Sequence, residues 1–306
     1  MRGKTPFLSV VVTIVDGGEM LRKFLRALTT QEDPPSMEIL LPYDASIPEI
    51  AEFRGEFPDI TYLAMGVTEI LRPIDTGAGQ HELYDRRRAA GLAAARGTLI
   101  GILEDRAPVR ANWARNVVLL HDKLPYGIIG GAIECAPCDL LNWAFYVCDL
   151  SRYGLPFEGG PWPMVSDVNV SYKRKMMDDT RHIWETRFNE AVVHWALREK
   201  GETIFLSPDL VVDYHTPYTS LAGVMPERFH WGRLFGHVRG KAMNPLSRVA
   251  HVVLGPLIPF VLLIRHGQAQ ARKGNLGRYL LAAPLVFVLS VGWAAGEVWG
   301  NITGRP

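Results

Sequence analysis

Short apolar runs alternate with helix-forming segments over the first hundred residues, and this alternation is the feature that most restricts the fold. The run at 7–14 is continuous and β-branched, as expected of a parallel strand covered on both faces. Similar apolar runs lie at 37–46, 60–65 and 98–103, and helix-forming stretches lie between them at 19–31, 48–57 and 86–96. The pattern predicts a doubly wound α/β sheet, in which ligands bind beyond the carboxyl ends of the strands.

The pattern continues more loosely after Trp113. We expect a helix over 112–123, a strand over 126–134, a strand leading into a helix over 168–177, a helix over 188–201 and strands within 203–215. The helix at 188–201 is amphipathic and is stopped by Gly201.

Composition excludes some classes of function. The 306 residues carry a formal charge of only +1, and the sequence has neither a basic stripe nor a known nucleic-acid module. We therefore expect no nucleic-acid partner.

Cysteine usage and the N-terminus indicate a reducing compartment. Three cysteines are too few for a disulfide framework in a chain of this size. Cys135 and Cys138 have the spacing of a redox or zinc motif, but without a second pair or a ligand histidine beside them we interpret them as small apolar residues in a turn. The N-terminal apolar run resembles a first strand rather than a signal peptide, so the domain that follows is expected in the cytosol.

The composition becomes more apolar and more basic beyond residue 222. The run at 249–264 is short and holds two prolines, whereas 279–296 has eighteen residues without a formal charge. A straight span needs about 20 residues, so the second run is a marginal transmembrane candidate and the first is expected to be re-entrant or interfacial. Basic residues between them favour the cytoplasmic face. The alternative is a pair of buried core helices.

Acidic side chains follow several predicted strands. Asp16, Asp44 and the pair Glu104-Asp105 each come at a strand end. Adjacent carboxylates are costly to hold together unless a positive charge is shared between them. A divalent cation bridging a diphosphate would supply that charge, and oxygen ligands fit Mg²⁺ or Mn²⁺. The alternative is a solvated loop in which Arg106 pairs with a neighbour.

Several motifs occur in the order found in one enzyme family. "SVVVTIVD", "EILLPYDAS", "RRRAAGLAAARGTLIGILEDR" and "FNEAVVHWALREKG" follow one another with its spacing. The chain thereby resembles a family 2 glycosyltransferase of the GT-A type over residues 7–215. The resemblance implies a Rossmann-like mixed, mainly parallel sheet with helices on both faces, followed by C-terminal hydrophobic helices. It also implies an inverting transfer of a sugar from a nucleoside-diphosphate donor.

The resemblance divides the chain into domains. Residues 1–221 would form the catalytic domain, with a nucleotide-sugar half over about 1–110 and an acceptor half over about 111–221. Residues 222–306 would form a basic juxtamembrane segment and membrane-associated helices, which places the protein at the cytoplasmic membrane.

The resemblance also assigns residues to the donor nucleotide. Asp44 matches an aspartate that hydrogen-bonds a uracil-like base, which favours UDP, although Tyr43 and Ala45 depart from the family's pattern. Thr13 and Asp16 fall on the donor side of the site.

The diphosphate and metal are assigned to a second group of residues. Arg88 is expected near the diphosphate, Glu104 at the sugar or ribose, and Asp105 and His215 at the metal. Arg106 stands where many relatives have a third aspartate, which would weaken the metal requirement. The segment 228–239 is expected to bring Arg233 to the diphosphate; the alternatives are a basic helix on anionic lipid and a nucleic-acid patch.

The remaining assignments concern the acceptor. Glu190 matches the general base, with Glu185 as the second candidate, and His194 lies one helical turn further along and would position the base or the acceptor. The acceptor would enter over Trp162, Asp167 and Asn169. Because hydrophobic segments follow, a lipid-linked or cell-surface glycan is the expected acceptor, with membrane lipid as a further partner.

Two other functions stay open on the sequence alone. Substitutions at Tyr43, Arg106 and Asn189 are compatible with an inactive, membrane-anchored nucleotide-binding scaffold. A nucleotidyltransferase would also have an α/β sheet and acidic metal ligands at the strand ends. It would, however, have a basic, glycine-rich phosphate loop after the first strand, and "VDGGEMLRK" matches such a loop poorly.

Overall fold

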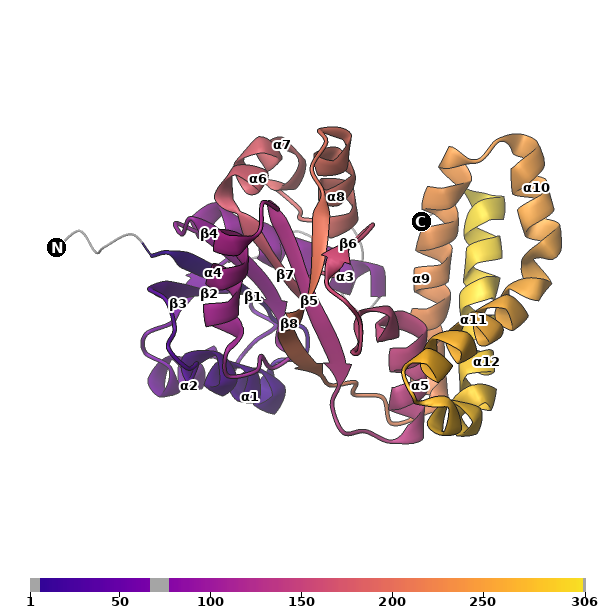
Figure 1. The fold of residues 1–306 in the computed structure, drawn as a ribbon, viewed down its shortest axis with the longest axis horizontal. Coiled ribbons are helices and arrows are strands. Elements are labelled where there is room, and N and C mark those ends of the chain that lie inside the picture. The colour runs from indigo at the N-terminus through magenta and orange to yellow at the C-terminus, as the bar shows by residue number, and fades with distance from the viewer. Residues whose placement is uncertain (1–5, 67–76, 305–306) are drawn as a thin grey trace. The chain divides into compact units, whose positions relative to one another are not determined.

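The computed structural model describes residues 6–66 and 77–304, which fall into two compact units (Figure 1). Unit 1 holds the described residues up to Glu134 together with Tyr153–Tyr214, and unit 2 holds Cys135–Arg152 and the residues from His215 onward. The sequence places 135–152 in the acceptor half of the catalytic domain, whereas the structure groups this segment with the C-terminal helices.

Unit 1 is built on an eight-stranded mixed sheet with strand order β3-β2-β1-β4-β7-β5-β8-β6. Strands β3, β2, β1 and β4 are parallel, β7 runs antiparallel to both β4 and β5, and β6 runs antiparallel to β8. The strands are β1 (Leu8–Thr13), β2 (Met37–Tyr43), β3 (Thr61–Ala64), β4 (Leu99–Glu104), β5 (Ile128–Cys135), β6 (Gly160–Pro161), β7 (Asn169–Lys173) and β8 (Ile204–Tyr214).

Helices connect most of the strands of unit 1. They are α1 (Gly18–Thr29), α2 (Ile50–Glu56), α3 (Gly77–Ala94), α4 (Trp113–Lys123), α6 (Arg174–Asp179), α7 (Arg181–Trp184) and α8 (Glu190–Glu199). Every residue of β1 and β4 is buried, as the continuous apolar runs predict for strands covered on both faces. The predicted α/β fold, with its mixed and mainly parallel sheet, is confirmed.

Helix α3 lies unusually close to the sheet. A Cβ atom added at Gly91 would come within 2.3 Å of Cγ1 of Val11 on β1, so only glycine permits this approach. The close contact brings Arg87 and Arg88, one turn earlier on α3, to the carboxyl ends of the central strands, where both are buried.

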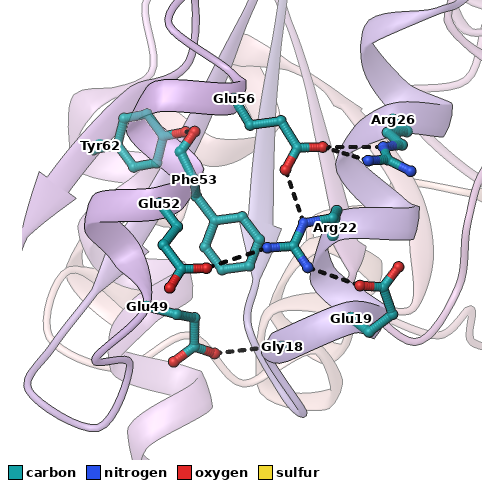
Figure 2. Close-up of polar contacts among 9 residues, drawn as sticks. All are labelled: Gly18, Glu19, Arg22, Arg26, Glu49, Glu52, Phe53, Glu56 and Tyr62. Carbon is teal, nitrogen blue, oxygen red and sulfur yellow. Dashed lines mark hydrogen bonds and ion pairs between the residues drawn. The ribbon is translucent and has the colours of Figure 1, made fainter.

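An ion-pair network joins α1 to α2 (Figure 2). Arg22 contacts Glu19 at 2.7 Å and Glu56 at 2.8 Å, and its guanidinium lies 5.3 Å from the centre of the Phe53 ring. Glu49 accepts a 2.8 Å hydrogen bond from the backbone N–H of Gly18, at the beginning of α1. Carboxylates therefore already occupy the N-terminal end of α1, which otherwise favours anions.

Unit 2 is helical. Its elements are α5 (Leu140–Asp149), α9 (Leu221–Ala242), α10 (Pro245–Leu254), the 3₁₀ turn η2 (Gly255–Leu257), α11 (Ile258–Arg272) and α12 (Leu276–Thr303); a further 3₁₀ turn, η1 (Ser151–Tyr153), follows α5. One hydrophobic core joins Trp143 and Phe145 of α5 to Tyr279, Val286 and Leu289 of α12. The sequence predicts no helix at 140–149, because that segment lies in a proline- and glycine-rich region.

Glycines allow α9 and α12 to pack backbone against backbone. A Cβ at Gly232 would lie 2.1 Å from the carbonyl oxygen of Trp293, and one at Gly296 would lie 2.0 Å from that of Phe229. Such small-residue contacts let two helices approach closely, as they do in membrane bundles.

Two helical stretches of unit 2 are long and apolar enough to cross a membrane, namely Pro245–Arg272 and Leu276–Thr303, each of 28 residues. Length and composition alone are weak support, because the core helix of a soluble protein can pass the same test. Only 11% of the most apolar window of the first stretch is buried, against 44% for the second. Leu246 and Leu281 are 84% and 72% exposed, so these helices are not simply core helices of unit 2.

The packing of α9 on α12 can be tested with two substitutions on one helix. Gly296→Ala should destabilise the chain by about 1–3 kcal/mol, because the added methyl group meets backbone that cannot turn aside. Gly277→Ala, which meets nothing within 4 Å, should be neutral or stabilise by up to about 1 kcal/mol. Thermal unfolding in detergent checks both, and equal melting temperatures would contradict the close contact.

Candidate active site

Several predicted site residues of unit 1 lie near one another because the strand ends meet at one edge of the sheet. Thr13 of β1 is in register with Glu104 of β4, and Leu103 of β4 is in register with Asn169, the first residue of the antiparallel β7. The carboxyl ends of the parallel strands and the segment before β7 therefore lie together. Asp167, in the segment before β7, lies close to this edge and contacts Arg88.

The guanidinium of Arg88 forms the centre of this region. It contacts Oε1 of Glu104 at 2.6 Å, Oδ2 of Asp167 at 2.8 Å and Oδ1 of Asp85 at 3.3 Å. The Arg88 side chain is only 5% exposed. Glu190, on α8, also interacts electrostatically with Arg88. We call these four carboxylates and Arg88 the Arg88 cluster.

One guanidinium cannot neutralise four carboxylates, and burial together with the excess charge raises the proton affinity of Glu190, Glu104 and Asp85. Burial, reinforced by the charge of Asp167, raises the pKa of Glu190 to about 8 and that of Glu104 to about 7. Burial likewise raises the pKa of Asp85 to about 7, although Arg88 opposes the change. The cluster can therefore hold or release a proton near neutral pH.

This geometry differs from the role expected for Arg88 from the sequence. The expected contact is with the donor diphosphate, whereas the structure places the guanidinium against carboxylates of β4, α3 and the segment before β7. Asp85 is absent from the sequence-based site. The sequence could have indicated Asp85, because it lies three residues before Arg88 on one helix and so faces the same side.

Glu190 begins α8 and is the better placed of the two candidate bases. The side chain of Asn189 caps the helix by accepting from the N–H of Val192, a role that asparagine fills well. Glu190 is partly exposed, whereas Glu185 is exposed at the end of α7, outside the Arg88 cluster contacts.

His194 lies one turn beyond Glu190 but is fully buried. Its Nε2 is 2.9 Å from the hydroxyl oxygen of Tyr172, and burial lowers its pKa to about 4. The imidazole is therefore neutral and is positioned by the sheet. Its predicted contact with base or acceptor stays a prediction.

The carboxylate of Asp105 binds the backbone of the loop between β1 and α1. Its Oδ1 accepts from the N–H of Val15 at 2.9 Å, and its Oδ2 accepts from the N–H groups of Gly17 at 2.8 Å and Asp16 at 3.2 Å. Gly17 has φ 70°, a left-handed conformation that suits glycine and turns its N–H toward the carboxylate. The loop is thus held in place by an internal anion.

These contacts fit poorly with the expected metal ligand. Asp105 is fully buried and both of its oxygens already accept backbone hydrogen bonds. Burial raises its pKa to about 6 despite those bonds. Within residues 6–66 and 77–304, no three His, Cys, Asp or Glu side chains are grouped so that they could hold a metal ion.

A fixed cation lies beside Asp105 instead. Arg106 binds Asp16 through two contacts, Nε to Oδ2 at 2.8 Å and Nη2 to Oδ1 at 2.6 Å. Tyr214, the last residue of β8, also hydrogen-bonds Arg106. The tripeptide Glu104-Asp105-Arg106 therefore divides its charges: Glu104 joins the Arg88 cluster, Asp105 binds the loop, and Arg106 pairs with Asp16.

Asp44 is held by a residue that the sequence does not single out. Its Oδ2 pairs with Arg87 at 2.8 Å, and its Oδ1 accepts from the N–H of Ser46 at 2.9 Å. Burial acts in the opposite direction, but these contacts together lower the pKa of Asp44. Three consecutive arginines gave no sequence signal for which of them would face Asp44.

The predicted acceptor residues have different environments. The amide of Asn169 accepts from Trp113 Nε1 at 2.9 Å and donates to the carbonyl oxygens of Ala132 and Leu210, both at 3.0 Å, so it joins strands within the sheet. Trp162 is partly exposed after β6. The Oγ1 of Thr13, predicted at the donor, is buried without a hydrogen-bond partner.

Two predicted site residues belong to unit 2, namely His215, predicted at the metal, and Arg233, predicted at the diphosphate. His215 follows β8 and is grouped with the helices, and Arg233 lies on α9, where its guanidinium is 3.5 Å from Nδ1 of His230. Their approach to the diphosphate stays a prediction.

Comparison with known proteins adds a fold relationship. No family model matches the chain, and no curated protein matches it. Among solved structures, it is similar to the mannosyltransferase PcManGT from Pyrobaculum calidifontis in complex with GDP-Man and Mn²⁺, with a TM-score of 0.56 and 15% sequence identity. The match covers 97% of this chain and 88% of that chain. At this identity the likeness shows the fold, which is the glycosyltransferase-like α/β fold.

The protonation of Glu190 predicts a pH dependence of stability. Because its pKa is about 8 in the folded chain and 4.5 ordinarily, the folded state binds the proton more tightly, and stability is lost as pH rises from about 4.5 to 8. Glu190→Gln should not show this loss. We expect its melting temperature to exceed that of the parent by about 3 °C or more at pH 8.5, with a smaller difference at pH 5.

Glu185→Gln is the matched control, because it removes an exposed carboxylate on the neighbouring helix end. It should follow the parent at both pH values. Parallel pH profiles for the parent and Glu190→Gln would contradict the raised pKa.

Proposed function

We propose that the chain is an inverting glycosyltransferase, of the family 2 type, that moves a sugar from a nucleoside-diphosphate donor to an acceptor hydroxyl. The observation that carries the proposal is the placement of Glu190. A partly exposed carboxylate with a pKa of about 8 stands at the carboxyl edge of a glycosyltransferase-like sheet, next to the segment before β7. A general base whose pKa lies near the working pH transfers protons efficiently.

The mechanism is a single displacement. Glu190 takes the proton from the acceptor hydroxyl as its oxygen attacks the anomeric carbon of the sugar. The bond from that carbon to the diphosphate oxygen breaks on the opposite face, so the configuration inverts and no covalent enzyme intermediate forms. The like charges of Asp167 and Asp85 raise the proton affinity of Glu190, and Arg88 keeps the carboxylates together.

The donor base is assigned to the Asp44 region. UDP is the first candidate, because Asp44 matches a residue that binds a uracil-like base in the resembled family. GDP is the second, because the structurally similar mannosyltransferase binds GDP-Man. In either case Arg87 orients Asp44 through its ion pair, and Thr13 offers a hydroxyl without a protein partner.

The charge on the leaving diphosphate is assigned to Arg106. Both oxygens of Asp105 already accept backbone hydrogen bonds. Arg106 carries a fixed positive charge at the strand end, is partly exposed and is paired with Asp16. Positive groups placed where negative charge develops lower the barrier without reorganisation. The Mn²⁺ of the similar structure is thus replaced, in this proposal, by a guanidinium.

The acceptor is proposed to be a lipid-linked or cell-surface glycan, with the catalytic unit in the cytosol at the membrane. Support comes from the exposed apolar residues of the two long helices of unit 2. Such an enzyme would serve polysaccharide or glycolipid synthesis.

The structure argues against a nucleotidyltransferase. The N–H groups of the loop after β1, which would hold the phosphates of such an enzyme, already bind Asp105 and Glu49. An inactive scaffold is the other alternative, and activity decides between them.

The proposal is tested by incubating the detergent-purified chain with a panel of UDP and GDP sugars. Release of one nucleoside diphosphate together with transfer to a lipid-linked acceptor supports it. Release of pyrophosphate would identify a nucleotidyltransferase. Nucleotide binding without hydrolysis or transfer would favour the scaffold.

Replacement of the base should separate chemistry from binding. Glu190→Gln should lower kcat by at least about 100-fold while leaving the Kd of the nucleotide nearly unchanged. Calorimetric titration and a product assay measure the two effects. Glu185→Gln is the control and should retain activity; loss of nucleotide binding in Glu190→Gln would refute the assignment as base.

The charge assignment predicts weak metal dependence. Chelation with EDTA should lower the turnover of the parent by less than about tenfold, whereas Arg106→Gln should lower it by about 100-fold or more. Arg110→Gln, which removes a half-exposed arginine four residues away, is the control. Abolition of parent activity by EDTA, with recovery on adding Mn²⁺, would show that a metal carries this charge.

A further inference from the structure

Two cysteines of unit 2 lie in contact. Cys135 ends β5, and Cys138 precedes Asp139, the N-cap residue of α5. Their Sγ atoms are 3.1 Å apart, and both residues are partly exposed. The separation is a thiol–thiol hydrogen bond, and a disulfide between them would require only a small movement.

The surroundings activate Cys138. The hydrogen bond from Cys135 lowers the pKa of the Cys138 thiol to about 7, and the charge of Arg278 acts in the same direction. Burial and the charge of Asp139 act against it. The Nη2 of Arg278 lies 3.9 Å from Sγ of Cys138 and donates to its carbonyl oxygen at 3.2 Å. The N-terminal end of the ten-residue α5 adds a favourable dipole.

The third cysteine, Cys148 near the C-terminal end of α5, provides a contrast within unit 2. Burial raises the pKa of Cys148 to about 12, so its thiol stays protonated and unreactive. Activation is therefore a property of the Cys135/Cys138 pair and not of cysteines in this unit generally.

We propose that Cys135 and Cys138 form a redox-active dithiol that exchanges with small-molecule disulfides such as oxidised glutathione. The described residues offer no third His, Cys, Asp or Glu ligand that would make this pair a metal centre. The sequence pattern alone led to the opposite interpretation, because it does not show the contact between the sulfurs or the arginine beside them.

The reaction is a two-step thiol–disulfide exchange. The Cys138 thiolate attacks one sulfur of oxidised glutathione, which breaks its disulfide and releases one glutathione thiolate. The Cys135 thiol then loses its proton and its sulfur attacks Sγ of Cys138, releasing the second glutathione. The protein loses two electrons and two protons, and one glutathione disulfide becomes two thiols.

Oxidation would also change the contacts of α12. Arg278 lies on its first turn and stacks 4.8 Å from the ring centre of Trp143 on α5. Oxidation removes the thiolate charge and so weakens the electrostatic attraction between Cys138 and the Arg278 guanidinium. The redox state of the pair is thus coupled to the junction of α5 and α12.

The test is a redox titration of the full chain in detergent. The chain is equilibrated with glutathione mixtures, quenched with acid and unfolded in denaturant so that Cys148 also becomes reactive. It is then labelled with a maleimide at neutral pH, and the labels are counted by mass spectrometry. We expect three labels under reducing conditions and one under oxidising conditions, with two lost together and a mass decrease of two hydrogen atoms. Retention of three labels across the series, or glutathione adducts without an internal disulfide, would overturn the proposal.

Variants separate the pair from its surroundings. Cys135→Ser and Cys138→Ser should each abolish the paired loss, while Cys148→Ser should keep it. Arg278→Gln should shift the alkylation profile of Cys138 to higher pH, and Arg272→Gln, an exposed arginine ending α11, should not. This readout is independent of glycosyl transfer, so the redox site and the proposed function can fail separately. An unchanged alkylation profile in Arg278→Gln would show that the guanidinium does not activate Cys138.

Discussion

The burial of the Arg88 guanidinium is the interaction on which the candidate site depends. An arginine cannot shed its proton inside a protein, so its charge must be matched by carboxylates. Those carboxylates come from β4, from α3 itself and from the segment before β7, with Glu190 of α8 nearby. Loss of one partner from a buried pair typically costs about 3–5 kcal/mol. The ion pairs therefore hold distant parts of the chain together. Burial, reinforced by the excess of negative charge, raises the proton affinity of Glu190, the member that begins a helix.

A second set of internal charges fixes the loop after β1 and the end of β2. Asp105 binds the backbone of the loop after β1, Glu49 binds the first N–H of α1, and Arg87 holds Asp44. The anion-binding groups of the loop are thus already satisfied, and Arg106, paired with Asp16, is the cation that we propose for the diphosphate. The tripeptide Glu104-Asp105-Arg106 resembles a metal motif in sequence. In the structure Asp105 binds the backbone of the loop, and Arg106 supplies a positive charge beside it. This division explains how an arginine can stand at the third position without disrupting the sheet edge.

Periodicity was sufficient to predict most of the fold, and the reason is burial. β1 and β4 are apolar throughout because both faces are covered, and the amphipathic stretch at 188–201 contains α8. The strand ends that carry Asp16, Asp44 and Glu104 were also predicted, whereas the contact of Asp167 with Arg88 was not. The sequence could not tell which of three consecutive arginines would face Asp44 and which would face Glu104, because that depends on how Gly91 docks α3. Nor could it show that Asp105 turns back onto its own loop, or that α5 joins the C-terminal helices, since both depend on contacts between segments far apart in the chain.

The central claim is that the Arg88 cluster gives Glu190 a proton affinity suited to a base near neutral pH. It is tested most directly by carboxyl-¹³C NMR of glutamate-labelled protein, with Glu190 assigned by its absence in Glu190→Gln. The account predicts that Glu190 titrates near pH 8 and that Asp167→Asn, which removes the neighbouring like charge, lowers this value. Titration of Glu190 near 4.5, unaffected by Asp167→Asn, would contradict it.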